Sequence, residues 1–248
     1  MITTLKPDWP VSENVVAYTT TRRGGVSVSP FGHLNVATHV GDLPAAVQEN
    51  RRRLVTELGL PGEPNWLSQT HSTALVKIGE EGLQDVPDAD AAYTDCTNQV
   101  LVIMTADCLP VFLATRDGSE VALVHAGWRG MANGIIERTL CAFSAPTDEI
   151  CAWLGPAISQ TNFTVGNDVR TAMLKRNSEH DTAFIKHGLK YKACLYTLAR
   201  QQLAKAGFVG GGEHCTFEEA DKFYSFRRDG TTGRMANLIY KTESALSA

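Results

Sequence analysis

A near-continuous apolar run at positions 100–105 constrains the fold of this 248-residue chain more than any other segment. An apolar run of this length predicts a strand that is buried on both faces. Two further short strands are predicted at 111–114 and 121–125, and a turn at 115–118 joins them. The central sheet is therefore expected to be covered by other parts of the chain on both sides.

Helices and strands are both predicted along the chain, without the strict alternation of a doubly wound parallel fold. The further strands are expected at 15–20, 151–154, 223–226 and 235–240. The helices are expected at 44–58, with Asp42 as the N-cap, and at 130–143, 166–176 and 190–206. Because no linker, repeat or low-complexity tract divides the chain, we expect an α+β fold with mixed sheets in a single domain of residues 1–248.

The overall composition excludes some classes of function. The formal charge of −4 argues against a general nucleic-acid binder, although a small anionic substrate is compatible with it. The N-terminal residues contain no apolar segment typical of a signal peptide, and no run approaches the roughly 20 residues that cross a bilayer. Together with six scattered cysteines, these features predict a cytoplasmic protein that does not bind membranes.

Two histidines and one cysteine, His71, Cys108 and His125, lie at or just beyond the ends of predicted strands. Three protein ligands with an open fourth position are typical of a catalytic zinc site. Asp107, directly before Cys108, is a candidate general base. A single one of these residues is more often structural, so the interpretation depends on all three ligands meeting.

Arginines supply the candidate sites for an anionic substrate. Arg129 lies between glycines at the predicted start of a helix, where free N–H groups bind anions, and a solvent-exposed loop arginine is the alternative. Arg51 falls on the apolar stripe of the helix at 44–58. Its guanidinium either points at a carboxylate or phosphate in a cleft, or its stem covers the core and its charge reaches solvent.

Two other chemistries use the same side chains. In a metal-free cysteine hydrolase, Cys108 would be the nucleophile and His125 or His71 its base. A blue multicopper oxidase is not expected, because its copper centres require about ten histidine ligands. The chain has seven histidines and no His-X-His pair, although one copper ion at the three-ligand site is compatible with it.

The chain resembles the YfiH family, also called the laccase-domain or peptidoglycan-editing-factor family. The segments that carry this resemblance most specifically are Thr-Ala-Asp-Cys-Leu-Pro-Val at 105–111 and His-Ala-Gly-Trp-Arg-Gly at 125–130. Further matching segments lie at 21–27, 34–35, 49–51, 66–71, 88–91, 153–158 and 224–229. The resemblance therefore covers nearly the whole chain.

The resemblance implies a four-layer α/β/β/α fold shared with cysteine-hydrolase-like toxin domains, and a zinc site at His71, Cys108 and His125. It implies phosphorolysis of adenosine, inosine, guanosine and methylthioadenosine, together with adenosine deamination. Copper-dependent polyphenol oxidation and editing of peptidoglycan precursors are other activities described for the family. We expect a nucleoside and phosphate as substrates and a monomer or weak dimer. Asn35, within a matching segment, and Arg227 or Arg228 are added to the candidate substrate-binding residues.

Overall fold

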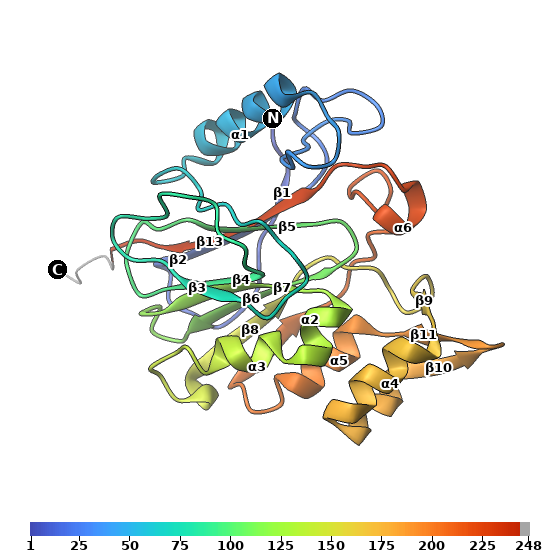
Figure 1. The fold of residues 1–248 in the computed structure, drawn as a ribbon. Coiled ribbons are helices and arrows are strands. Elements are labelled where there is room, and N and C mark those ends of the chain that lie inside the picture. The colour runs from blue at the N-terminus through green and yellow to red at the C-terminus, as the bar shows by residue number, and fades with distance from the viewer. Residues whose placement is uncertain (244–248) are drawn as a thin grey trace.

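A computed structural model describes residues 1–243, which contain two sheets packed face to face and a smaller third sheet (Figure 1). The four-stranded antiparallel sheet has the order β1 (Thr4–Leu5), β2 (Val15–Thr20), β13 (Met235–Lys241) and β5 (Leu101–Thr105). The six-stranded mixed sheet has the order β12 (Phe208–Gly211), β8 (Ile150–Leu154), β6 (Leu109–Thr115), β7 (Val121–Ala126), β4 (Ala91–Thr94) and β3 (Leu75–Lys77). The third sheet contains β10 (Phe184–His187), β11 (Lys190–Ala193) and β9 (Thr164–Val165).

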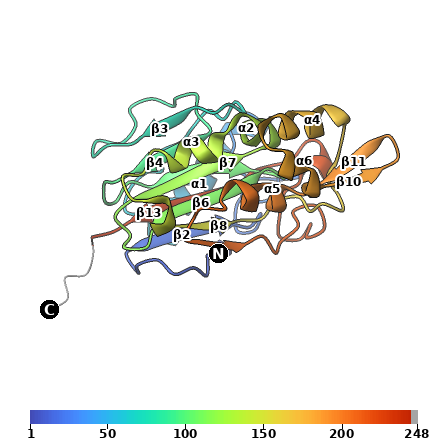
Figure 2. The ribbon, with the colours of Figure 1, turned by 90° about the horizontal axis from the view of Figure 1, so that it is seen from below.

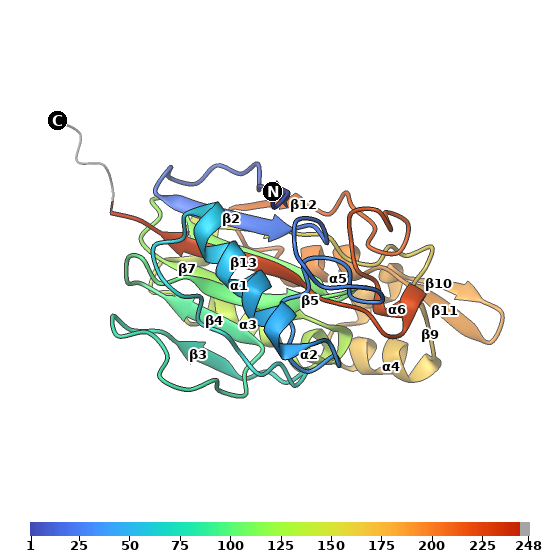
Figure 3. The same ribbon diagram turned by 90° about the horizontal axis from the view of Figure 1, so that it is seen from above.

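Helices cover the outer faces of the two large sheets. Helix α1 (Pro44–Leu58) lies across the four-stranded sheet, as seen from above in Figure 3. The six-stranded sheet is covered by α2 (Trp128–Asn133), α3 (Ile135–Leu140) and α5 (Leu195–Gln202), and α4 (Asn167–Arg176) lies beside α2 (Figure 2). The remaining helical segments are α6 (Phe226–Asp229) and two 3₁₀ turns at Thr147–Glu149 and Ser178–Ala183. No helix of residues 1–243 has the length and apolarity needed to span a membrane.

The period-2 alternation of strand β5 explains why both of its faces are apolar. Leu101 and Ile103 pack between the two sheets, whereas Val102 and Met104 pack toward α1. Strand β6 repeats this pattern: Phe112 faces the four-stranded sheet, and its neighbours in the chain face the helices. The expectation of a strand buried on both faces, and of an α+β fold with a mixed sheet, is confirmed.

Three predicted elements differ from the structure. The helix expected at 130–143 is divided into α2 and α3 by Gly134, which has a φ of 91° and ends α2. Residues Lys190–Ala193 form strand β11, because Gly188 closes a hairpin with β10, and only Leu195–Gln202 of the expected helix is helical. No strand forms at 223–226, because Ser225 caps the short helix α6.

The expected N-cap of α1 is also wrong. The cap residue is Leu43, and no side chain caps the helix. The Asp42 carboxylate instead accepts hydrogen bonds from Ser27 and Asn35, and so holds together separate parts of the long connection between β2 and α1. The C-terminal end agrees with expectation, since Gly59 adopts a left-handed conformation there.

The close packing around Gly25, in the connection between β2 and α1, can be tested by substitution. A Cβ atom at this position would lie 2.2 Å from the His33 carbonyl oxygen and 2.5 Å from the Leu34 Cα, which are both backbone atoms. We expect Gly25→Ala to lower the free energy of unfolding by about 3 kcal/mol, because the backbone itself has to move. Gly62→Ala is the matched control, since nothing lies within 4 Å of its added methyl group. Equilibrium denaturation checks this, and equal stability of the two variants would contradict it.

Candidate active site

The candidate site lies where the chain crosses from one large sheet to the other. Strand β5 belongs to the four-stranded sheet and β6 to the six-stranded sheet, so Ala106, Asp107 and Cys108 connect the two sheets. His125 lies at the adjacent end of β7 and is paired with Pro110 of β6. His71 reaches the same place from the loop before β3.

The three side chains meet in a geometry that suits a metal ion. One ligand atom from each of His71, Cys108 and His125 lies within 4.8 Å of the other two. The distance from His71 Nε2 to Cys108 Sγ is 3.8 Å. Tetrahedral zinc with ordinary bond lengths separates a nitrogen and a sulfur ligand by about 3.6 Å. The structure therefore brings these residues together at a spacing that fits a three-ligand zinc site.

Gly127 supplies the space that this cluster needs. A Cβ atom here would lie 3.0 Å from His71 Cδ2 and 3.3 Å from Cys108 Sγ. With a larger residue here, the His71 and Cys108 side chains would have to shift by a few tenths of an ångström.

The buried carboxylate of Asp90, just before β4, fixes two of the three ligands. Its Oδ1 lies 2.7 Å from His125 Nδ1, so the other ring nitrogen of His125 is directed toward the cluster. The same carboxylate accepts backbone N–H bonds from Thr70, His71 and Ser72, at 3.2, 3.0 and 2.6 Å. These bonds stabilise the loop of His71, whose φ of 58° is in the left-handed region.

Electrostatics favour a thiolate and an imidazolium in the metal-free site. Burial raises the pKa of the Cys108 thiol, but the charge and hydrogen bonding of His125 and His71 outweigh it, so this pKa falls to about 6. Burial lowers the pKa of His125, but the Cys108 thiolate and Asp90 raise it to about 9. Burial also raises the pKa of Asp90, whereas bonds from His125 and Ser72 bring it well below its usual range.

Asp107 has a φ of 93°, a strained conformation for a residue other than glycine. Its carboxylate accepts a hydrogen bond from the Thr216 hydroxyl at 2.7 Å and one from the Arg227 backbone N–H at 2.6 Å. Asp107 thus links the connection between β5 and β6 to the start of α6. It also lines the cavity next to Cys108.

The cluster opens into a cavity of about 450 Å³, a size typical of small-molecule sites. Its walls combine aromatic and cationic side chains with the metal-ligand cluster. The lining residues are His39, Gln69, His71, Met104, Thr105, Ala106, Asp107, Cys108, His125, Trp128, Arg129, Ile158, Phe163, Phe226, Arg227 and Arg234.

The two predicted arginines of the cavity lie over aromatic rings. The guanidinium carbon of Arg129 is 4.4 Å from the Trp128 ring centre, and that of Arg227 is 5.2 Å from the Phe163 ring centre. Both side chains are exposed, and neither forms an ion pair with a carboxylate of residues 1–243. Each keeps a positive charge available to a ligand.

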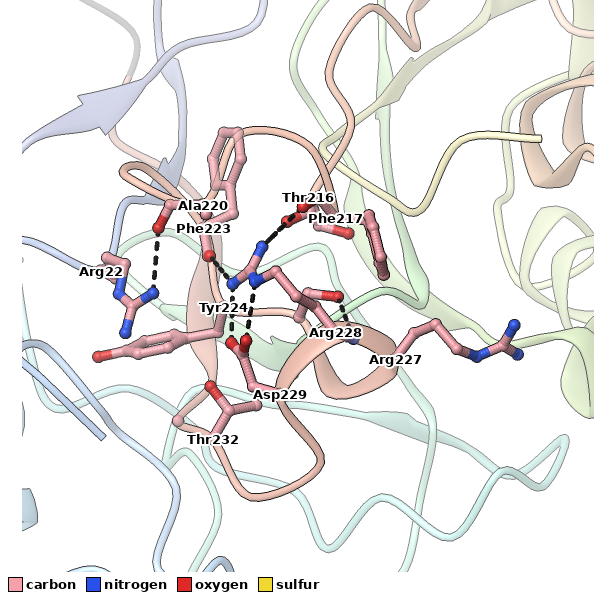
Figure 4. Close-up of polar contacts among 12 residues, drawn as sticks. Arg22, Thr216, Phe217, Ala220, Phe223, Tyr224, Arg227, Arg228, Asp229 and Thr232 are labelled. Atoms are coloured by element: carbon pink, nitrogen blue, oxygen red, sulfur yellow. Dashed lines mark hydrogen bonds and ion pairs between the residues drawn. The ribbon is translucent and has the colours of Figure 1, made fainter. Parts of the chain in front are cut away.

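Arg227 and its neighbour Arg228 have different surroundings in the structure. The Arg228 guanidinium pairs with Asp229 at 2.8 Å and donates to the backbone carbonyls of Thr216, Phe217 and Phe223 (Figure 4). In the same view the side chain of Arg227 points away from this group. Arg228 therefore stabilises the loop before α6, and Arg227 is the one that lines the cavity.

Arg51 and Asn35 are not brought to the cavity wall. The Arg51 guanidinium lies 3.6 Å from the centre of the Trp66 ring and donates to the Val36 carbonyl, while burial lowers its pKa to about 10. Asn35 is fully buried, and its side chain bonds to Ala37, Asp42 and the backbone N–H of Arg234. Asn35 therefore acts through its neighbours rather than by touching a cavity ligand.

Sequence reasoning missed Asp90, Arg234 and His39. Asp90 lies in a segment that matches the family, and an acidic residue directly before an apolar strand is a signal that could have identified it. Arg234 follows a glycine-containing turn and lies far along the chain from His125, which lines the same cavity. No local pattern links two such positions.

Comparison with known proteins identifies the family of the chain. Residues 16–242 match a family described as multi-copper polyphenol oxidoreductase laccase. Purine nucleoside phosphorylase YfiH of Escherichia coli is 46% identical over 236 residues, covering 94% of this chain and 97% of the relative. A purine nucleoside phosphorylase of Haemophilus influenzae is 47% identical over 242 residues, covering 95% and 98%.

Solved structures show the same fold. A Neisseria meningitidis protein of the DUF152 family is 46% identical, with a TM-score of 0.92 and coverage of 96% of this chain and 99% of the other. YlmD of Geobacillus stearothermophilus is 32% identical, with a TM-score of 0.92 and coverage of 97% and 96%. With a family match over nearly its whole length and relatives well above 30% identity, the chain belongs to the YfiH family.

Proposed function

We propose that this chain is a zinc-dependent purine nucleoside phosphorylase, with residues 1–248 forming one catalytic domain. The observation that carries the proposal is the meeting of His71, Cys108 and His125 in a cavity whose walls carry aromatic rings and arginines without carboxylate partners. Relatives that match 94–95% of the chain are named purine nucleoside phosphorylase. Adenosine, inosine, guanosine and methylthioadenosine are the substrates we expect.

The cavity residues match the chemistry of phosphorolysis. A phosphate oxygen forms a bond to ribose C1′ while the bond from C1′ to the purine breaks, and the base takes the electron pair. A zinc ion at the cluster would supply Lewis acidity. Arg129 and Arg227 favour the entry of the phosphate anion, and the rings of Trp128 and Phe226 offer faces on which a purine stacks.

Adenosine deamination is the second activity that we propose for the same cavity. Water adds to the purine C6, the bond from C6 to the exocyclic amino nitrogen breaks, and that nitrogen leaves as ammonia. Asp107 would carry a proton from the water to the leaving nitrogen. The hydrogen bonds from Thr216 and the Arg227 backbone N–H keep the carboxylate beside the cluster. Each carboxylate oxygen retains a lone pair for this role.

A cysteine hydrolase, for example an amidase that edits peptidoglycan precursors, is the alternative to the two nucleoside reactions. Cys108, His125 and Asp90 stand in the order of a nucleophile, a base and the carboxylate that orients the base. The layering of α1, the two sheets and the outer helices supports a relation to the four-layer α/β/β/α fold of cysteine-hydrolase-like toxin domains. No metal takes part in this chemistry.

Copper is the alternative to zinc as the ion at the same cluster. A blue multicopper oxidase requires about ten histidine ligands, and this chain has seven. Within residues 1–243, one group of three potential ligands is close enough to share an ion. We therefore propose zinc as the working metal, and regard a single copper ion with polyphenol oxidation as the alternative.

The first prediction is phosphate-dependent cleavage. The zinc-loaded protein, without ATP or a nicotinamide cofactor, should split adenosine or inosine into base and ribose 1-phosphate only when phosphate is present. Cys108→Ser should lower bound zinc and activity together, whereas Cys141→Ser, at an exposed position outside the cavity, should change neither. Metal analysis and product chromatography check this. If no nucleoside is consumed with zinc and phosphate supplied, the amidase proposal replaces this one.

Arginine replacement distinguishes the two nucleoside reactions. Arg129→Gln should lower kcat/KM for phosphorolysis about tenfold and that for deamination less than twofold, because only phosphorolysis uses the anion. Both rates are measured on adenosine with the same preparation. Equal losses would show that Arg129 has a structural role.

The charge state of Cys108 can be tested in metal-free protein. Because its pKa is lowered to about 6, the thiolate fraction and the rate of alkylation should rise between about pH 5 and 7 and then stay level. Peptide mass spectrometry gives this rate for Cys108, with exposed Cys141 as the reference cysteine. His125→Gln should move the midpoint to higher pH. A Cys108 rate that still rises between pH 8 and 10 in the unmodified sequence would contradict the thiolate assignment.

Metal loading separates the two candidate functions. In the phosphorylase, a chelator abolishes activity and bound zinc protects Cys108 from alkylation. In the hydrolase, chelators have no effect and stoichiometric alkylation of Cys108 abolishes activity.

A further inference from the structure

Arg234, at the cavity wall directly before β13, has a charge that the protein does not neutralise. Its guanidinium forms no ion pair with a carboxylate of residues 1–243 and donates only through Nη1, to the carbonyls of Thr232 and Gly233 at 2.9 and 3.0 Å. Nε and Nη2 have no acceptor among these residues. They share one edge of the planar guanidinium, the edge that presents two parallel N–H groups to a carboxylate or phosphate.

Arg234 differs from the two other arginines of the cavity in its burial. Arg129 and Arg227 are exposed and solvated by water, but Arg234 is partly buried. Burial lowers the pKa of Arg234, although the charges of Cys108 and Asp107 oppose this effect. A guanidinium withdrawn from water without an anionic partner destabilises the protein, and an anion in the cavity would remove this cost.

The backbone around Arg234 is held rigidly. Its N–H donates to Asn35 Oδ1 at 3.0 Å, and the Asn35 amide is anchored on Asp42. A Cβ atom at Gly233 would lie 2.7 Å from the Tyr224 ring and 2.9 Å from Asn35 Cβ, so the chain is closely packed there. A guanidinium on such a support loses little entropy when it binds a ligand.

Arg234 lines the same cavity as the metal-ligand cluster and lies near an aromatic ring. Its guanidinium carbon is 5.7 Å from the centre of the Phe226 ring, a side chain 58% exposed at the cavity. His39 lines the same wall; burial, followed by the charges of Arg234 and Arg51, lowers its pKa. This part of the cavity therefore combines the Arg234 guanidinium with one aromatic face.

Building on the proposed function, we propose that Arg234 binds the phosphoryl group in the cavity through its Nε–Nη2 edge. The ligand to which we commit is free phosphate, the second substrate of phosphorolysis. Arg129 and Arg227 raise the local concentration of the anion, and Arg234 makes the two-bond contact. Asn35 positions Arg234 by accepting a hydrogen bond from its backbone N–H.

Steady-state kinetics of the zinc-loaded full-length protein tests this contact. Arg234→Met should raise KM for phosphate about ten- to hundredfold and leave KM for adenosine within twofold, because two charge-assisted hydrogen bonds are lost. Arg234→Lys, which keeps the charge but not the edge, should fall between the two. Arg200→Met is the matched control: Arg200 also donates to backbone carbonyls, those of Val209 and Gly211, but lies outside the cavity. An unchanged KM for phosphate in Arg234→Met would overturn the proposal.

Ligand protection against thermal unfolding tests the same contact without catalysis. Inorganic phosphate should raise the Tm of the unmodified protein and of Arg200→Met, but not that of Arg234→Met. If this pattern is found but no nucleoside is cleaved, the Arg234 subsite stands and the proposed phosphorylase function fails. If phosphate raises the Tm of Arg234→Met as much as that of the unmodified protein, the subsite is wrong even where phosphorolysis is observed.

Thermal protection by a nucleotide, compared with that by free phosphate, identifies the source of the phosphoryl group. If free phosphate is the ligand, phosphate together with adenosine protects more than adenosine monophosphate does, and Arg234→Met removes the phosphate part. If adenosine monophosphate protects more strongly, and that advantage depends on Arg234, the assignment to free phosphate is overturned in favour of a nucleotide.

Discussion

The buried Asp90 carboxylate is the interaction on which the candidate site depends. It lies 2.7 Å from His125 Nδ1 and accepts three consecutive backbone N–H bonds from the loop that carries His71. A single charge therefore sets the direction of one imidazole and the backbone conformation that presents the other. Because both oxygens are used in this way, the ligands are positioned before any ion binds.

The two-sheet architecture determines where this chemistry is located. β5 and β6 are consecutive in the chain but lie in different sheets. The short connection between them therefore passes from one sheet to the other. That connection carries Cys108, next to a residue with a strained φ of 93°. Gly127 leaves room for the ligands to meet. His71 and Asp107, two non-glycine residues with a positive φ, both line the cavity, and strained backbone of this kind is common at functional sites.

How much could be predicted depends on whether a signal is local. The apolar run of β5 and the Pro44–Leu58 helix depend on neighbouring residues, and both were predicted correctly. The His71, Cys108 and His125 cluster was identified because its members follow recognisable strand ends and family motifs. Lys190–Ala193 was predicted to be helical, since nothing in its composition reveals its pairing with β10. Arg51 lies on a predicted helix and Arg234 follows a turn, and only tertiary packing places Arg51 on Trp66 and Arg234 at the cavity.

Zinc affinity measured by competition with a chromophoric chelator tests the role of Asp90 most directly. Asp90→Asn keeps the size of the side chain but removes the charge that orients His125 and the His71 loop, so the Kd for zinc should rise about 10- to 100-fold. Glu120→Gln is the matched control, because Glu120 is also a buried carboxylate on backbone N–H groups, those of Ser144 and Ala145, and does not line the cavity. Its zinc affinity should be unchanged. Equal zinc affinity in Asp90→Asn and the unmodified protein would contradict the account.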